Sequence, residues 1–113
     1  MDYERIISDY FTNEASVAAV FIFGSVLKVG IKQAEDVDIG IVLNQPSTPC
    51  KRADFVIKNS IALSSLLGKE VDLVVLNDAP TLLKYKVIEK GKRLLEKDMI
   101  TSRRFETRVV MEY

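Results

Sequence analysis

Three aspartates and a glycine-serine pair are the residues of this chain whose types and spacing could do chemistry. Asp36 and Asp38 are separated by one residue, and Asp72 lies in a later segment of the same alternating pattern. Gly24 and Ser25 come first, and ten residues separate Ser25 from Asp36. Carboxylates bind divalent cations, and a glycine before a helix lets backbone N–H groups approach a phosphate. Together these residues predict metal-dependent nucleotidyl transfer.

The two neighbouring aspartates are expected to lie on one face of a strand. The segment Val37–Leu43 is apolar enough to be that strand. Side chains alternate across a strand, so Asp36 and Asp38 point to the same side, roughly 6.5 to 7 Å apart. Gly40 follows on that face, where the missing side chain leaves room for a ligand or a neighbouring backbone. The two carboxylates therefore converge on one side of the sheet.

Asp72 has the same setting in a second expected strand, Glu70–Leu76. If the two strands are neighbours, Asp72 presents a third carboxylate to the same place. Crowded carboxylates repel one another, and a divalent cation offsets that cost. Oxygen ligands suit Mg²⁺ or Mn²⁺ rather than zinc, and two such ions can hold the attacking and leaving oxygens of a phosphoryl displacement. We therefore expect Asp36, Asp38 and Asp72 to be metal ligands and catalytic residues.

Gly24 and Ser25 are the expected nucleotide-binding residues. They follow the apolar segment Val17–Phe23, which is expected to be a buried strand, and precede a short segment with room for a turn or two of helix. Glycine permits close approach of the backbone to a phosphate, and the Ser25 hydroxyl adds a donor. Lys28 could add a positive contact, although a lysine is more often a solvated surface charge. A nucleoside triphosphate fits this edge.

Strands and helices alternate along the chain, which predicts an α/β or α+β fold with a mixed sheet of about four strands, packed by helices on one side. The expected strands are Val17–Phe23, Val37–Leu43, Glu70–Leu76 and Arg93–Glu96. The expected helices are Tyr3–Phe11, Lys51–Leu67 and the segment between Asp78 and Gly91. The tail Thr101–Tyr113 is apolar enough to dock on the domain or on another chain, so a homo-oligomer or hetero-oligomer is plausible.

Length and composition limit the classes of function. The 113 residues fit one domain, residues 1–113, which leaves little room for a second substrate, so a partner is expected to hold part of it. Sixteen basic residues balance sixteen acidic ones, which disfavours broad nucleic-acid binding. No histidine is present, and the lone Cys50 is interpreted as an incidental loop residue. The longest apolar run, Val17–Phe23, is far shorter than the roughly 20 residues of a membrane span, so we expect a soluble cytoplasmic protein without membrane contact.

The segment Phe23-Gly24-Ser25, the gap of ten residues, the Asp36-x-Asp38 pair and Asp72 resemble the signature of the DNA polymerase β-like nucleotidyltransferase superfamily. Over nearly its whole length the chain is similar to the minimal nucleotidyltransferases of the MntA-like antitoxin type, which act with HepT-type HEPN toxins. The resemblance implies a polymerase β-like fold and Mg²⁺-dependent transfer of AMP from ATP to a hydroxyl of the toxin, with release of pyrophosphate.

The same resemblance implies a role for each residue of the motif. Gly24 and Ser25 hold the triphosphate, and Asp36 and Asp38 bind both metal ions. Asp72 binds the catalytic ion and helps to deprotonate the acceptor.

Two positions depart from the pattern of the family. Many members carry an arginine-glycine pair soon after the Gly-Ser, where this chain has Lys28 before Val29-Gly30. Lysine keeps the charge without the bidentate fork of arginine. Many members also have a small polar residue before the first aspartate, where this chain has Glu35, whose charge would weaken triphosphate binding if it points inward.

Three other interpretations stay open at this point. A non-catalytic antitoxin of this fold would neutralise its toxin by binding alone. A small-molecule nucleotidyltransferase, such as one that modifies an aminoglycoside, would normally need a further domain for its acceptor. Aspartates near turns are also common as purely structural residues, and the combined spacing is the argument against that interpretation.

Overall fold

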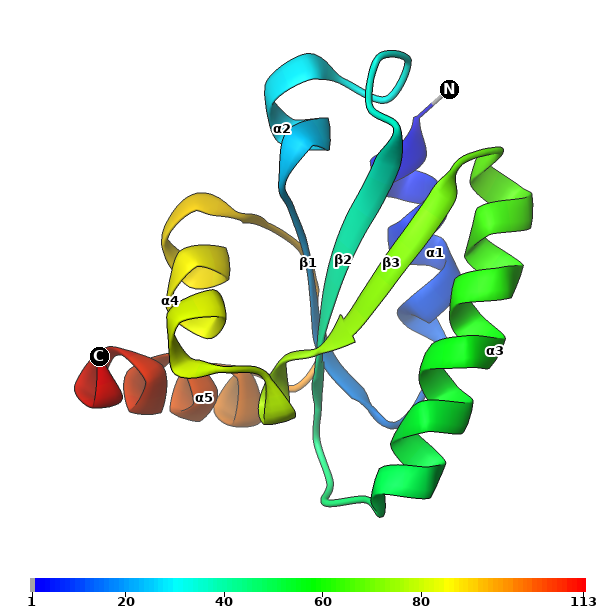
Figure 1. The fold of residues 1–113 in the computed structure, drawn as a ribbon. Helices are drawn as coiled ribbons and strands as arrows, with labels where there is room; N and C mark the ends of the chain where they lie inside the picture. Colours follow the sequence, from blue (N-terminus) through cyan, green and yellow to red (C-terminus); the bar gives the residue numbers. More distant parts are fainter. Residues whose placement is uncertain (1) are drawn as a thin grey trace.

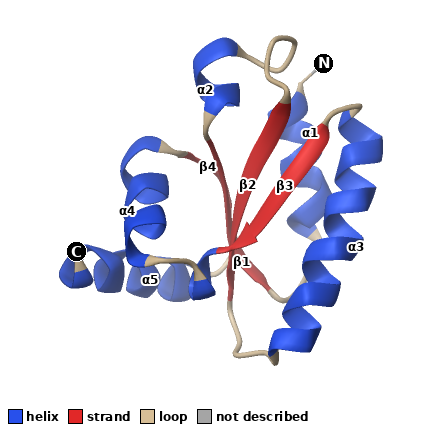
Figure 2. Ribbon diagram, in the orientation of Figure 1, coloured by secondary structure: helices blue, strands red, loops and turns tan. Residues whose placement is uncertain are grey.

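The computed structural model describes residues 2–113 and, within them, a four-stranded sheet with helices packed against it (Figures 1 and 2). The strands are β1 (Val17–Phe23), β2 (Asp36–Leu43), β3 (Glu70–Val75) and β4 (Lys92–Glu96). The helices are α1 (Tyr3–Thr12), α2 (Ser25–Val29), α3 (Pro49–Leu67), the 3₁₀-helix η1 (Leu76–Asp78), α4 (Thr81–Lys90) and α5 (Met99–Glu112). The prediction of a mixed sheet of about four strands packed by helices is confirmed.

The strand order in the sheet is β3-β2-β1-β4. The central strand β1 runs antiparallel to both β2 and β4, whereas β2 and β3 are parallel and are connected through α3. Parallel neighbours need a crossover connection, and the 19-residue helix α3 provides it. This connection places the starts of β2 and β3 side by side, at the end of the sheet that carries the aspartates.

Helices cover both faces of the sheet, so the prediction of helices on one side was wrong (Figure 1). On one face, Ile7 and Phe11 of α1 and Leu63 of α3 belong to the main apolar core. On the other face, Val87 of α4 belongs to a second apolar cluster, and Phe105 of α5 packs against it. An unbroken apolar strand such as β1 is typical of a strand that is buried on both faces.

Local signals set the ends of α1 and α3 close to the predicted positions, although α3 begins at Pro49, two residues before the predicted Lys51. The Asp2 carboxylate accepts a hydrogen bond from the backbone N–H of Arg5 and caps α1. Thr48 caps α3 in the same way through the N–H of Lys51, and α3 ends at Gly68 in the left-handed conformation. Cys50 lies exposed in the first turn of α3, so its interpretation as a loop residue was wrong.

The C-terminal tail forms helix α5, which was expected only as an apolar docking segment. An ion-pair network joins it to β4: Arg93 pairs with Glu106, and Arg103 pairs with Glu96. The Ser102 hydroxyl, which is buried, also donates to Glu96 at 2.8 Å. Polar contacts therefore attach α5 in addition to the apolar packing of Phe105. None of the helices within residues 2–113 has the length and apolar character to cross a membrane.

Candidate active site

The register of β2 and β3 brings the three predicted aspartates together. Asp38 is the direct partner of Asp72, and Asp36 is the partner of Glu70. Register partners of neighbouring strands project to the same face of a sheet. The structure therefore confirms that Asp36, Asp38 and Asp72 lie side by side, while their catalytic roles stay predictions.

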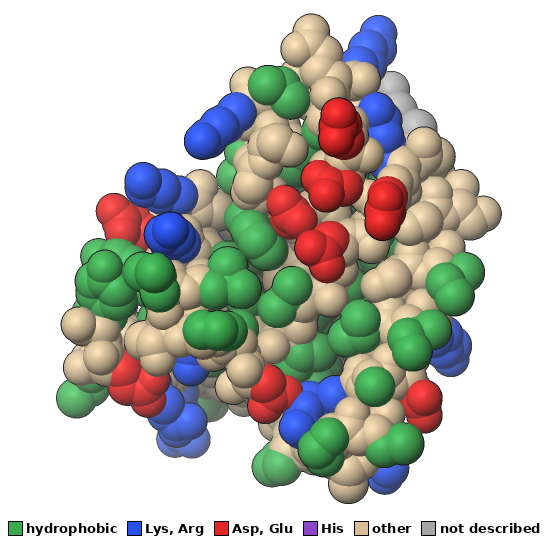
Figure 3. All heavy atoms as spheres, in the orientation of Figure 1, with side chains coloured by type: hydrophobic (Ala, Val, Ile, Leu, Met, Phe, Trp, Pro, Cys, Tyr) green, Lys and Arg blue, Asp and Glu red, His purple; other side chains and the backbone are tan. Residues whose placement is uncertain are grey.

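Glu70 is a fourth carboxylate in this group, and it was not among the predicted site residues. It alternates with Asp72 along β3 in the same way as Asp36 alternates with Asp38 along β2. The repeated acidic-apolar-acidic pattern was the available signal. Figure 3 shows acidic side chains gathered over the starts of β2 and β3. We refer to Asp36, Asp38, Glu70 and Asp72 as the carboxylate cluster.

The electrostatic strain of the cluster is centred on Asp38. Burial raises the pKa of the Asp38 carboxyl above its ordinary value, and the neighbouring Asp36 and Asp72 raise it further, with a hydrogen bond to Asp72. Like charges opposite one another on neighbouring strands destabilise a sheet. A cation beside Asp38 would offset this cost, so the cluster is suited to binding one.

Gly24 lies against this cluster at the end of β1. Its neighbour Phe23 is the register partner of Asp38, and a Cβ atom at position 24 would lie 2.2 Å from Oδ2 of Asp38. Gly24 also has φ 79°, a conformation that other residues rarely adopt. Both the contact and the backbone conformation therefore require glycine at the point where the chain passes the carboxylates.

The other two predicted nucleotide-binding residues lie in the short helix α2. Ser25 is its first residue and is exposed, directly after Gly24. The first N–H groups of a helix lack partners within the helix. Ser25 thus follows the glycine that lies against Asp38, and it is exposed. Lys28 lies exposed in the last turn of α2, and its contact with a phosphate stays a prediction.

The space beside Gly40 is filled by a side chain, and not by a ligand or a backbone as expected. A Cβ atom at Gly40 would lie 2.8 Å from Cδ1 of Leu76. Leu76 is fully buried in the cluster of apolar residues that α4 covers. The glycine therefore lets the apolar core of this face extend up to the carboxylate cluster.

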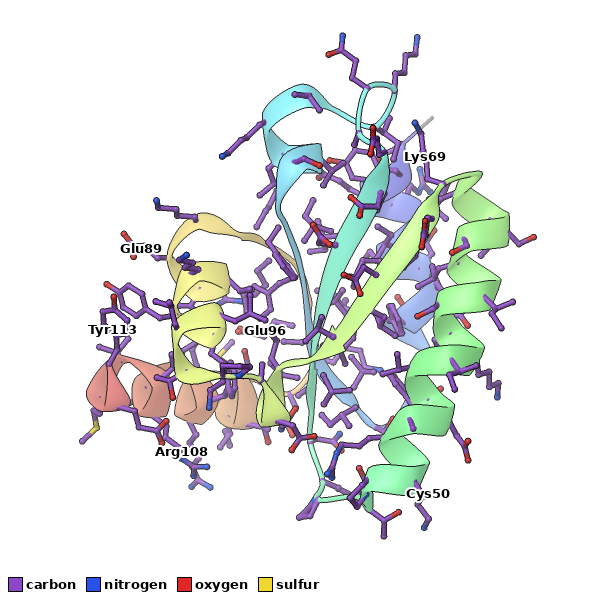
Figure 4. The ribbon with its side chains drawn as sticks, viewed as in Figure 1. Cys50, Lys69, Glu89, Glu96, Arg108 and Tyr113 are labelled. Atoms are coloured by element: carbon purple, nitrogen blue, oxygen red, sulfur yellow. The ribbon has the colours of Figure 1, made fainter. Side chains whose placement is uncertain are left out.

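Lys69 connects the two strands that carry the cluster. It precedes β3, and its ammonium group donates hydrogen bonds to the backbone carbonyls of Ala34, at 2.8 Å, and Lys32, at 3.2 Å (Figure 4). Both carbonyls belong to the loop that leads into Asp36. Hydrogen bonds from a charged donor are stronger than neutral ones. Lys69 therefore fixes the loop before β2 against the start of β3.

Replacing Lys69 with methionine is expected to lower the melting temperature by about 4 to 8 °C, which corresponds to about 1 kcal/mol in a domain of this size. Lys32→Met is the matched control, because it removes an exposed lysine charge but keeps the carbonyl that accepts from Lys69. Thermal unfolding followed by circular dichroism measures both. Equal melting temperatures for the two variants would show that the Lys69 hydrogen bonds do not support the loop.

The donor atoms of the cluster fit magnesium. All four side chains offer carboxylate oxygens, which are the ligands that Mg²⁺ prefers. Burial and the neighbouring carboxylates of Asp36 and Asp72 raise the pKa of Asp38, and a bound cation would favour its ionised form. Within residues 2–113, no three acidic or cysteine side chains already form a closed set of metal ligands. These carboxylates would therefore have to turn toward an ion as it binds.

The family model "Polymerase beta, Nucleotidyltransferase" matches residues 5–100 of the chain. This match spans most of the sequence, including every member of the carboxylate cluster. The chain belongs to this nucleotidyltransferase family. The predicted superfamily, its fold and the assignment as a nucleotidyltransferase enzyme are confirmed.

Solved structures share the fold of this nucleotidyltransferase. The toxin-antitoxin MntA-HepT has a TM-score of 0.70 and 24% identity, over 98% of this chain and 84% of that chain. A toxin-antitoxin with AMP-PNP has a TM-score of 0.72 and 24% identity, over 100% and 87%. A tri-AMPylated HEPN toxin from Shewanella oneidensis in complex with an MNT antitoxin gives 0.69 and 23%, over 98% and 83%. At this level of identity the likeness establishes a shared fold. No curated protein matches the chain.

Proposed function

We propose that this nucleotidyltransferase transfers AMP from ATP to a hydroxyl group of a HEPN-type toxin and thereby acts as the antitoxin of the pair. The observation that carries the proposal is the placement of Gly24 against Asp38, with Asp72 as the register partner of Asp38. A phosphate-binding turn and a set of carboxylates that can face one phosphorus atom are what nucleotidyl transfer requires. The structures of similar fold include an MNT antitoxin in complex with a tri-AMPylated HEPN toxin.

Residues on or next to three strands, β1, β2 and β3, would each have a different role in the reaction. Gly24 and Ser25, after β1, bind the triphosphate through backbone N–H groups and the serine hydroxyl. Asp36 and Asp38 hold Mg²⁺, which supplies positive charge to the phosphate oxygens and the leaving group when it is bound. Asp72 accepts the proton of the incoming hydroxyl group, because it is the exposed aspartate on the edge strand β3.

The transfer of AMP needs no reactant other than ATP and the acceptor hydroxyl group. The acceptor oxygen forms a bond to the α-phosphorus of ATP, and the bond from that phosphorus to the oxygen bridging to the β-phosphorus breaks. Pyrophosphate leaves with the electron pair of the broken bond, and the hydroxyl proton passes to the Asp72 carboxylate. In-line geometry requires the acceptor to approach from the side opposite the pyrophosphate.

Mass analysis of the toxin tests this function directly. We expect incubation of the HEPN-type partner with this chain, ATP and Mg²⁺ to increase the partner's mass by one or more AMP units, and EDTA to prevent the increase. Labelled ATP shows in the same experiment whether the label reaches protein or a small molecule. An unmodified partner, in a preparation that binds ATP, would contradict the proposal and favour neutralisation by binding alone.

A further inference from the structure

The strand order separates a donor side of the site from an acceptor side. Gly24, which would hold the triphosphate, follows the central strand β1, and Asp36 and Asp38 lie on the next strand, β2. Asp72 lies on β3, which is the edge of the sheet. From β1 to β3, the expected triphosphate site, metal site and proton acceptor therefore follow one another in this order. Asp72 is exposed, so a protein that brings a hydroxyl group to it can approach from the side of β3.

An apolar groove runs along this edge of the sheet. It has a volume of about 440 Å³ and lies between α3, β3 and the start of α4. The apolar side chains that line it include Val56, Ile57, Leu73, Val75, Pro80 and Leu83. Val74, which also lines it, lies two residues from Asp72 on the same face of β3, a separation of roughly 6.5 to 7 Å. We call this feature the β3 groove.

The space-filling view shows the relation of apolar surface to the site. Hydrophobic side chains continue from the acidic group across the middle of the same face (Figure 3). Ile57 is 59% exposed although it is a large apolar residue, and it lines the β3 groove on the α3 side. Apolar surface next to a reactive site commonly marks a binding surface. The groove thus begins within reach of a side chain held at Asp72.

The charge of the site defines the chemistry of the occupant. Glu35 precedes the carboxylate cluster, so five acidic residues lie at the starts of β2 and β3. Lys69 lies between these two segments through its hydrogen bonds to the loop before β2, so the acidic residues there outnumber it. Complementary charge steers partners and fixes their orientation. The segment that approaches should therefore carry basic residues close to its hydroxyl group.

We propose that the β3 groove binds the acceptor protein, through an apolar segment of that protein with basic residues beside the hydroxyl that receives AMP. This inference rests on the proposed function and specifies where its protein substrate docks. The apolar part of the segment packs against Ile57 and Leu83 along the edge of β3. Its basic residues lie next to the carboxylate cluster and bring the hydroxyl group to Asp72. The ATP site on the side of β1 is left uncovered.

Steady-state kinetics of two groove variants test the proposal. Ile57→Gln and Ala53→Gln both change exposed residues that line the groove, so neither should disturb the core. We expect each variant to raise KM for the HEPN-type partner about 10-fold, because Ile57→Gln removes an apolar contact and Ala53→Gln places a polar side chain in the groove. KM for ATP should be unchanged, because the donor side is not altered. Ile100→Gln is the matched control, since Ile100 is 67% exposed and lies on α5, outside the groove.

Each outcome decides between the two proposals. If the wild-type chain modifies the partner and the groove variants keep its KM, the docking site is wrong and the proposed function stands. If Ile100→Gln raises KM as much as the groove variants do, the binding surface is not specific to the β3 groove. If the wild-type chain modifies no protein in the presence of ATP and Mg²⁺, the proposed function and the docking site are both wrong.

Discussion

Replacing Asp38 with asparagine is expected to reduce AMP transfer to the toxin by at least about 1,000-fold. The change removes a charge that lies between Asp36 and Asp72 and that would hold Mg²⁺. Loss of several kcal/mol of charge stabilisation in the transition state corresponds to a reduction of this size. Binding of the partner should be retained, because the side chain keeps its size and the β3 groove is unchanged. Transfer of labelled AMP and an affinity measurement on the same sample give both quantities.

Asp38→Asn should make the folded chain more stable, although it lowers the rate of AMP transfer. A carboxyl group whose pKa is raised by folding destabilises the folded chain at every pH above its unfolded pKa, near 3.8. At pH 7 without metal, Asp38→Asn should therefore melt at a higher temperature than the wild type. Asp54→Asn, at an exposed position of α3, is the control and should change neither property. Full neutralisation of the toxin by Asp38→Asn, with transfer abolished, would show that the antitoxin acts by binding.

Replacing Gly24 with alanine is expected to lower kcat/KM for AMP transfer by about 100-fold or more. The new methyl group would lie 2.2 Å from Oδ2 of Asp38, so either the Asp38 side chain or the turn must move. A displacement of a reacting group by about 1 Å can lower the rate about 100-fold. The positive φ of position 24 adds backbone strain of about 1 to 3 kcal/mol. Kinetics and thermal unfolding separate the two effects.

Gly30 provides a matched control for this substitution. It has φ 81°, close to the 79° of Gly24, but a Cβ atom there would meet nothing within 4 Å. Gly30→Ala should therefore lose stability to a similar extent and keep most of its activity. If Gly30→Ala loses as much activity as Gly24→Ala, backbone strain rather than contact with Asp38 explains the effect.

The sequence contains most of the information that positions the site. The Asp36-x-Asp38 pattern and the apolar residues between the carboxylates place both side chains on one face of β2, and the structure has them there. The alternation Glu70-Val71-Asp72 predicts the same for β3. Which strands pair depends on the whole chain, so the pairing of β2 with β3 was inferred only from the similarity of their sequences. The register of β2 and β3 then places Glu70 beside Asp36.

The parts that the sequence did not predict depend on contacts between distant residues. Phe105 and Val109 provide apolar contacts for α5, but the ion pairs that also hold it involve Arg93 and Glu96 of β4. The spacing of apolar residues along the sequence does not indicate which charged residues form ion pairs. Gly40 is a second example, because the side chain beside it is that of Leu76, which directly follows β3. A glycine near the carboxylates indicates that another group approaches closely, but it does not indicate which group.

Exposure of Cys50 in the first turn of α3 has a practical consequence. It is the lone thiol of the chain, so a maleimide dye would label a single position without mutagenesis. A 19-residue helix is roughly 28 Å long, which separates this position from the carboxylate cluster near the other end of α3. Arg52 and Ala53, close by in the sequence, line the β3 groove. A fluorophore on Cys50 would therefore report arrival of the toxin in real time while the reacting groups stay unlabelled.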